Sequence, residues 1–97
     1  MLILERTADF DQWLNALKDV VAQKRILARL ERLAEGHWGD CKAFDGMIEL
    51  RFHLSGGYRI YCWQSGDVVV LLLCGGNKSS QLRDIAKAKK MITLLEE

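Results

Sequence analysis

Apolar and polar residues alternate most regularly between residues 47 and 64. From Ile48 to Leu54 every second residue is apolar, and Glu49, Arg51 and His53 stand between them. A similar alternation covers residues 58–64, after a pair of glycines at 56 and 57. A period of two is typical of a strand with one buried face, and adjacent glycines favour the short turn of a hairpin. The pattern therefore predicts two antiparallel strands, 47–54 and 58–64.

A third strand is predicted over residues 68–74, which are all apolar and follow the turn sequence Ser65-Gly66-Asp67. A strand without polar residues is expected at the centre of a sheet, with both of its faces covered. The first two strands differ, because one of their faces carries polar groups that should face solvent. The residues expected together on that face are Glu49, Arg51, His53, Arg59 and Tyr61.

Helical spacing of apolar residues marks the segments on either side of these strands. The expected helices follow caps at Thr7 or Asp9, at Asp19, and at Asn77, Ser79 or Ser80. Their expected buried stripes are Phe10, Trp13, Leu14 and Leu17; then Val20, Leu27, Leu30 and Ala34, flanked by Ile26 and Leu33; then Leu82, Ile85, Ile92 and Leu95. The second helix should run from about Val20 to Glu35, because Gly36 stands where a helix-terminating glycine belongs.

The remaining segments complete the predicted fold. Residues 2–7 should form a short strand, and residues 37–45 a loop. The order is then β-α-α-β-β-β-α, which is an α+β fold with a small, mostly antiparallel sheet. The first two helices should form a hairpin on one face of the sheet, followed by a C-terminal helix. At this length, residues 1–97 are predicted to form a single domain.

Composition excludes few functions. The chain has 14 Lys and Arg against 13 Asp and Glu, so its net charge does not indicate a nucleic-acid partner, although a local basic patch would suffice. Its three cysteines lack metal or redox spacing, which predicts reduced thiols in a cytoplasmic protein. No signal peptide is predicted, since charged residues follow Leu4 at once, and the apolar run at 68–74 is too short to span a membrane.

Motifs that would fix a reaction are rare in this chain. Glycines and Lys78 follow the third strand, but without the spacing of a nucleotide-binding loop, so this segment favours at most the phosphate of a nucleic acid. Neither histidine has ligand neighbours at metal spacing, and no metal or other cofactor is predicted. Arg51 and Arg59 have two interpretations: a solvated network with Glu49, or, with Lys78, a cradle for phosphate and base.

Four runs of sequence carry a family resemblance. They are Glu49-Leu50-Arg51, Gly57-Tyr58-Arg59-Ile60-Tyr61, the segment 70–79 and Asp84-Ile85-Ala86-Lys87-Ala88. Together they resemble the addiction-module killer proteins, the HigB-like, phage-derived branch of the RelE/ParE toxin superfamily. The similarity covers nearly the whole chain, since it extends upstream to Phe10, Trp13, Leu14, the Arg-rich second helix and Gly39-Asp40. It implies the same order of helices and strands.

The resemblance implies a toxin of a type II toxin–antitoxin module that acts as a metal-independent endoribonuclease, or mRNA interferase. In such enzymes the RNA 2′-hydroxyl attacks the adjacent phosphate, and the protein orients the attack and offsets the charge. The resemblance assigns Arg59 to the scissile phosphate, and places Lys78, Glu49 and Arg51 around it. Where such nucleases carry a C-terminal tyrosine or histidine as acid or base, this chain has neither; the candidates are Glu49, His53 and Asp84. The implied RNA contacts are Arg51, Arg59, Tyr61, Lys78, Arg83 and Lys87.

Two other functions stay open at this point, because the C-terminal tyrosine or histidine is missing. One is a ParE-like poison of DNA gyrase, and the other is an inactive toxin-like protein that binds a repressor. The resemblance also implies partners: a HigA-like helix-turn-helix antitoxin, mRNA on the ribosome, and operator DNA only through the antitoxin.

Overall fold

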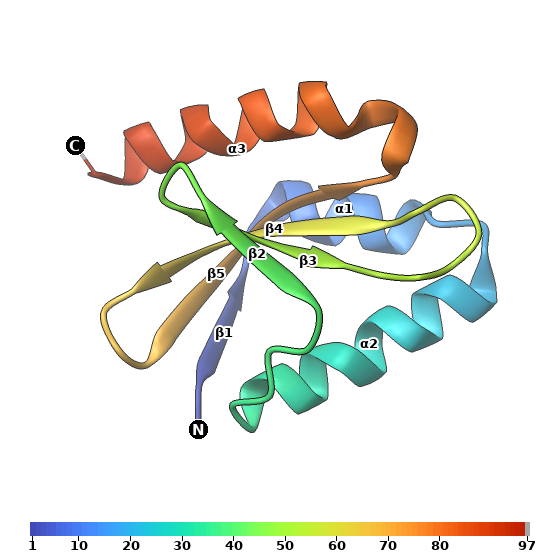
Figure 1. Ribbon diagram of the computed structural model, residues 1–97, viewed down its shortest axis with the longest axis horizontal. Helices are drawn as coiled ribbons and strands as arrows, with labels where there is room; N and C mark the ends of the chain where they lie inside the picture. The colour runs from blue at the N-terminus through green and yellow to red at the C-terminus, as the bar shows by residue number, and fades with distance from the viewer. Residues whose placement is uncertain (97) are drawn as a thin grey trace.

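The computed structural model describes residues 1–96 and has the α+β organisation that the sequence predicts (Figure 1). A single 3-10 turn, Lys78–Ser80, leads into the last helix. The elements are β1 (Ile3–Arg6), α1 (Ala8–Ala16), α2 (Val20–Ala34), β2 (Cys41–Phe44), β3 (Met47–Arg51), β4 (Arg59–Ser65), β5 (Val69–Gly76) and α3 (Gln81–Glu96). The order β-α-α-β-β-β-α is therefore wrong by one strand, because β2 occupies part of the predicted loop.

The five strands form one mixed sheet in the order β1-β5-β4-β3-β2. Only β1 and β5 pair in parallel, and the other neighbours are antiparallel, so the prediction of a mostly antiparallel sheet is confirmed. The apolar strand β5 lies between β1 and β4. The missed strand β2 is a short edge strand whose residues are all at least partly exposed, which leaves no alternation to detect. Its turn, Asp45-Gly46, has φ angles of 50° and 78°, as a tight hairpin turn requires.

Helices cover both faces of the sheet, with α1 and α2 on one face and α3 on the other (Figure 1). The core under α1 and α2 includes Phe10, Ile26 and Leu50, and the core under α3 includes Met47, Tyr61 and Ile92. The expectation of an open polar face is therefore wrong. A covered second face follows from the apolar positions of α3, which need a surface to pack on.

The helix termini have the predicted caps, but the buried faces of α2 and α3 differ from the predicted apolar stripes. Asp19 accepts a hydrogen bond from the Ala22 N–H, and Gly36 ends α2 with a φ of 98° and a bond to the Leu33 carbonyl. The predicted stripe residues Val20, Leu27, Leu82 and Leu95 are exposed instead. The buried positions of the two helices are Ala22, Ile26, Leu30 and Leu33 in α2, and Asp84, Ala88 and Ile92 in α3.

The end of β5 passes between two helices at very short range. A Cβ atom added to Gly75 would lie 2.4 Å from the Trp13 ring of α1, and one added to Gly76 would lie 1.8 Å from Asp84 of α3. Glycine is required at both positions because any side chain would clash, not because of a nucleotide-binding role. This close approach fixes the start of α3 against the sheet. Among residues 1–96, each helix is too short or too polar to form a membrane span.

Candidate functional site

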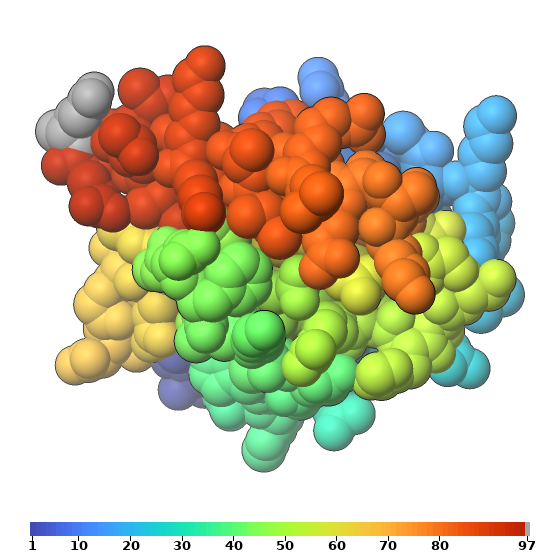
Figure 2. Space-filling model, turned by 45° about the horizontal axis from the view of Figure 1, so that its top comes forward, coloured from blue at the N-terminus to red at the C-terminus, as the bar shows by residue number. Residues whose placement is uncertain are grey.

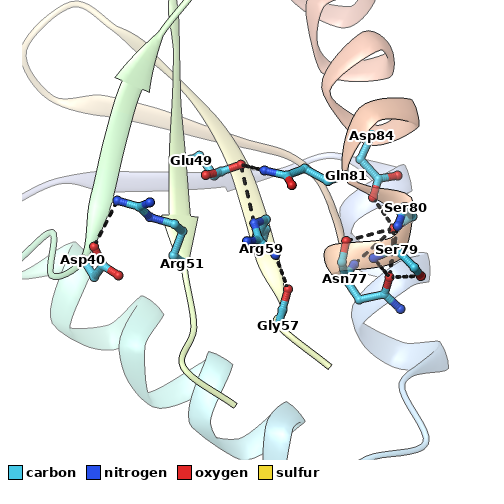
Figure 3. Close-up of polar contacts among 10 residues, drawn as sticks. All are labelled: Asp40, Glu49, Arg51, Gly57, Arg59, Asn77, Ser79, Ser80, Gln81 and Asp84. Atoms are coloured by element: carbon cyan, nitrogen blue, oxygen red, sulfur yellow. Dashed lines mark hydrogen bonds and ion pairs between the residues drawn. The ribbon is translucent and has the colours of Figure 1, made fainter. Parts of the chain in front are cut away.

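Two arginines from adjacent strands meet where β3 ends and β4 begins. Arg51 and Arg59 are direct partners in the antiparallel register, so their side chains leave the same face of the sheet. That face is the one that α3 covers, and the start of α3 overhangs this end of the sheet (Figure 2). The two side chains then diverge: Arg51 reaches toward Asp40, and Arg59 lies between Glu49 and Gly57 (Figure 3). Sequence reasoning brought both arginines to this place correctly.

Arg59 is held in one orientation by its neighbours. Its Nη1 donates a 2.7 Å hydrogen bond to the Gly57 carbonyl, and its Nε lies 3.8 Å from the Glu49 carboxylate. The side chain is only 17% exposed, so the expectation that it faces solvent is wrong. Gly57 has a φ of 62°, and a Cβ there would press on both Arg59 and Lys78, so glycine is required. Lys78 itself is exposed, and its backbone N–H donates to the Gly56 carbonyl.

Glu49 is a buried carboxylate at the centre of this arrangement. It is 3% exposed and accepts a 3.1 Å hydrogen bond from the side-chain amide of Gln81 at the start of α3. Beside it, the Tyr61 ring is fully buried, and burial together with the Glu49 charge raises the pKa of the Tyr61 phenol well above its ordinary value. Tyr61 therefore has no exposed face on which an RNA base could stack in this structure. Its proposed role as an RNA contact is not supported by this placement.

Asp84 organises the first turn of α3 rather than the arginine site. It is 7% exposed, lies over Gly76, and accepts a 2.5 Å hydrogen bond from the Ser80 hydroxyl (Figure 3). Asn77 caps the preceding 3-10 turn reciprocally with Ser80. The Asp84 carboxylate is thus engaged where β5 ends and α3 begins.

A second polar group lies beside Arg51, at the start of β2. The Nε2 atom of His53 is 2.6 Å from one oxygen of Asp40, and Nη2 of Arg51 is 3.4 Å from the other. The hydrogen bond with His53 and the nearby guanidinium of Arg51 keep the pKa of Asp40 below its ordinary value. Since an ionised carboxylate only accepts, Nε2 of His53 is the donor in this contact. The imidazole is 84% exposed.

The two predicted contacts on α3 lie on its exposed surface. Arg83 is exposed and forms no ion pair with another described residue, whereas Lys87 lies 3.6 Å from Asp9 of α1. Among residues 1–96 there is no group of three His, Cys, Asp or Glu side chains that could hold a metal ion.

Comparison with known proteins places the chain in a family. A family model described as "Phage derived protein Gp49-like (DUF891)" matches residues 12–94. The chain belongs to the Gp49-like family. This is a toxin-like family of the addiction-module type, associated with the toxins of toxin–antitoxin systems, and such membership suggests an antitoxin partner. An uncharacterized protein of Haemophilus influenzae is 46% identical over 87 residues, which cover 89% of this chain and 88% of that protein. No solved structure matches.

The matched segment of this Gp49-like protein contains the entire candidate site, from Asp40 to Lys87. Asp40 and Gln81 are the two members that sequence reasoning did not assign to the site. Nothing in the alternation of residues marks Gln81, because its role depends on how α3 docks. The pair Gly39-Asp40 formed part of the family resemblance, which was the one available signal for Asp40.

Proposed function

We propose that this Gp49-like protein is the toxin of a type II toxin–antitoxin module and acts as an endoribonuclease on mRNA bound to the ribosome. One observation carries the proposal: Arg51 and Arg59 are direct cross-strand partners, with Arg59 fixed by Gly57 and Glu49 and Lys78 beside it. Each guanidinium faces a single carboxylate, Asp40 for Arg51 and Glu49 for Arg59, and keeps further N–H donors for an anion bound above the pair. The phosphate of RNA supplies that anion.

The proposed chemistry needs no group beyond this chain and the RNA. The 2′-oxygen bonds to the adjacent phosphorus as its proton passes to a general base, and the bond from phosphorus to the 5′-oxygen breaks as that oxygen takes up a proton. The products carry a 2′,3′-cyclic phosphate and a 5′-hydroxyl. Arg59, Arg51 and Lys78 offset the charge that builds on the phosphorane, and a donor fixed before the reaction needs no reorganisation when that charge appears.

We assign the proton transfer to His53, with Asp40 as its positioning residue. Of the three candidates, the carboxylates of Glu49 and Asp84 are buried and engaged with Arg59, Gln81 and Ser80. His53 is exposed and linked to Arg51 through Asp40, so its imidazole is accessible to a substrate bound beside Arg51. Glu49 then acts through Arg59, by holding its guanidinium in place.

We propose a HigA-like helix-turn-helix repressor as the antitoxin, so that the complex, and not the toxin alone, binds operator DNA specifically. The antitoxin stabilises the toxin by binding only its folded state. Since α3 already covers the polar face of the sheet, an antitoxin that blocks the site acts at the exposed end beside Lys78 and His53. Full operator specificity of the isolated toxin would contradict this arrangement.

Expression without the antitoxin tests the proposed function. Growth should stop, and sequencing of RNA ends should reveal new 5′-hydroxyl ends within messages. Arg59→Lys keeps the charge but loses the two-pronged contact, so it should restore part of the activity that Arg59→Ala loses. Unchanged transcripts with an induced DNA-damage response would indicate a gyrase poison instead, and unchanged growth would indicate a protein whose only role is to bind its repressor.

A further inference from the structure

An arginine-lined cleft opens beside the candidate site, between α2 and the ends of β2 and β3. It has a volume of about 320 Å³. We call it the arginine cleft, and its charged lining consists of Arg25, Arg29, Arg32, Arg51, Asp40 and His53. Four guanidinium groups face one carboxylate, and that carboxylate is engaged by His53 and Arg51. The cleft therefore presents a strong local positive charge in a chain whose net charge is only +1.

Arg29 forms the floor of the cleft and serves the fold. Its guanidinium donates to the backbone carbonyls of Trp38, Asp40 and Arg51, and lies 4.6 Å from the centre of the Phe52 ring. Burial lowers its pKa, and the three carbonyls satisfy most of its donors. Arg29 thus fixes the loop that carries Asp40 and shapes the cleft, with little capacity left for a ligand.

Arg25 and Arg32 remain as the ligand-facing cations on α2. Both are exposed, and neither forms an ion pair with another described residue. They stand seven residues apart on one helical face, about 10 Å along the axis, with Arg29 between them. Two unpaired guanidinium groups spaced along a groove suit a linear polyanion better than a single small anion.

The cleft is continuous with the candidate site through Arg51, which lines the cleft and is the cross-strand partner of Arg59. We propose that the arginine cleft binds the phosphate backbone of the substrate RNA beyond the cleaved bond, so that one strand runs from Arg59 across Arg51 to Arg25 and Arg32. This inference rests on the proposed function and adds a binding subsite to it. An acidic segment of a protein partner is the competing occupant, and the test separates the two.

The test compares two double variants that remove the same charge from the same region. Arg25→Ala/Arg32→Ala removes the cleft cations, while Lys18→Ala/Lys24→Ala removes two exposed cations that do not line the cleft. Affinity for a labelled single-stranded 2′-O-methyl RNA of about 16 nucleotides, which cannot be cleaved, is measured against salt concentration. The cleft variant should bind roughly tenfold more weakly. The slope of log K against log salt concentration should become shallower by about 0.7 for each phosphate contact that is lost. On cleavable RNA its KM should rise with kcat unchanged, because the lost contacts are made equally in the ground and transition states.

Each contrary result has a distinct meaning. If the wild-type protein cleaves RNA but both double variants behave alike, the cleft proposal is overturned and the proposed function stands. If the wild-type protein neither binds nor cleaves RNA, the proposed function fails first. If the cleft variant keeps its RNA affinity but loses affinity for the antitoxin, the cleft belongs to a protein partner. Equal thermal stability of both variants shows that folding does not explain the difference, since all four side chains are exposed.

Discussion

Arg59→Ala should impair both stability and activity, and the structure separates the two effects. The Arg59 side chain is 17% exposed and that of Glu49 is 3% exposed, so the alanine variant leaves a buried carboxylate without its cation. Removing one member of a buried pair costs about 3–5 kcal/mol in well-formed cases. Here the 3.8 Å separation is long, and Gln81 still donates to Glu49, so we expect a loss of about 2–3 kcal/mol. For a domain of this size each kcal/mol lowers Tm by about 4–8 °C.

The catalytic effect is measured at a temperature where the variant is folded. Loss of one preorganised donor typically reduces the rate by about 100- to 1000-fold. Glu49→Gln/Arg59→Ala is the matched variant, because it removes the orphaned charge while the amide can still bond Gln81. It should recover about half of the lost stability and none of the activity. Thermal denaturation and RNA cleavage are measured on the wild type, both variants and Arg59→Lys.

Two results would refute this reasoning. If Arg59→Ala leaves Tm unchanged, the Glu49–Arg59 contact does not stabilise the fold. If the double variant regains activity along with stability, Arg59 supports the site only by keeping the protein folded, and its assignment to the scissile phosphate fails.

Five further substitutions test the site and the fold around it. His53→Gln and Asp40→Asn should slow cleavage, by about 100-fold or more for His53, without loss of thermal stability, because both side chains are exposed; equal rates would exclude the pair from proton transfer. Arg29→Ala should cost about 2–4 kcal/mol in denaturant unfolding, since three backbone carbonyls lose their donor. Tyr61→Phe should leave the fold at least as stable as the wild type in denaturant unfolding, because the buried hydroxyl forms no hydrogen bond of good geometry among residues 1–96. Burial raises the pKa of Cys74 to about 12, so the folded state keeps a proton that the unfolded chain loses above pH 9.0; stability should be constant below that pH and fall toward pH 12, less steeply in Cys74→Ala.

Much of the fold could be predicted because its signals are local. Examples are Gly36, which ends α2, Asp19, which caps it, and the apolar run of β5. Each acts through its own backbone or its nearest neighbours. The strand β2 was missed because an edge strand buries little, and its clearest sequence signal is the hairpin turn Asp45-Gly46. The helical stripes failed differently: Leu27 and Leu82 are apolar but exposed, so hydrophobicity alone did not fix the rotation of either helix.

Part of the candidate site could also be predicted, because that part depends on local sequence signals. Arg51 and Arg59 come together through a hairpin, which is a local feature of the sequence. The burial of Tyr61 and Glu49, the bond from Gln81 and the pairing of His53 with Asp40 all depend on how α3 and β2 dock from a distance. Alternation of residues reports which face of a strand is polar, but it does not report whether a helix covers that face.

The most direct measurement uses ribosomes that carry a message with a single 2′-deoxynucleotide at the mapped cleavage position. The purified protein should cut the all-ribose message there and leave a 5′-hydroxyl end, and it should not cut the message that lacks the attacking hydroxyl. Cleavage of both messages at that position would contradict attack by the 2′-hydroxyl, and cleavage of neither would contradict the assignment of this protein as a ribonuclease.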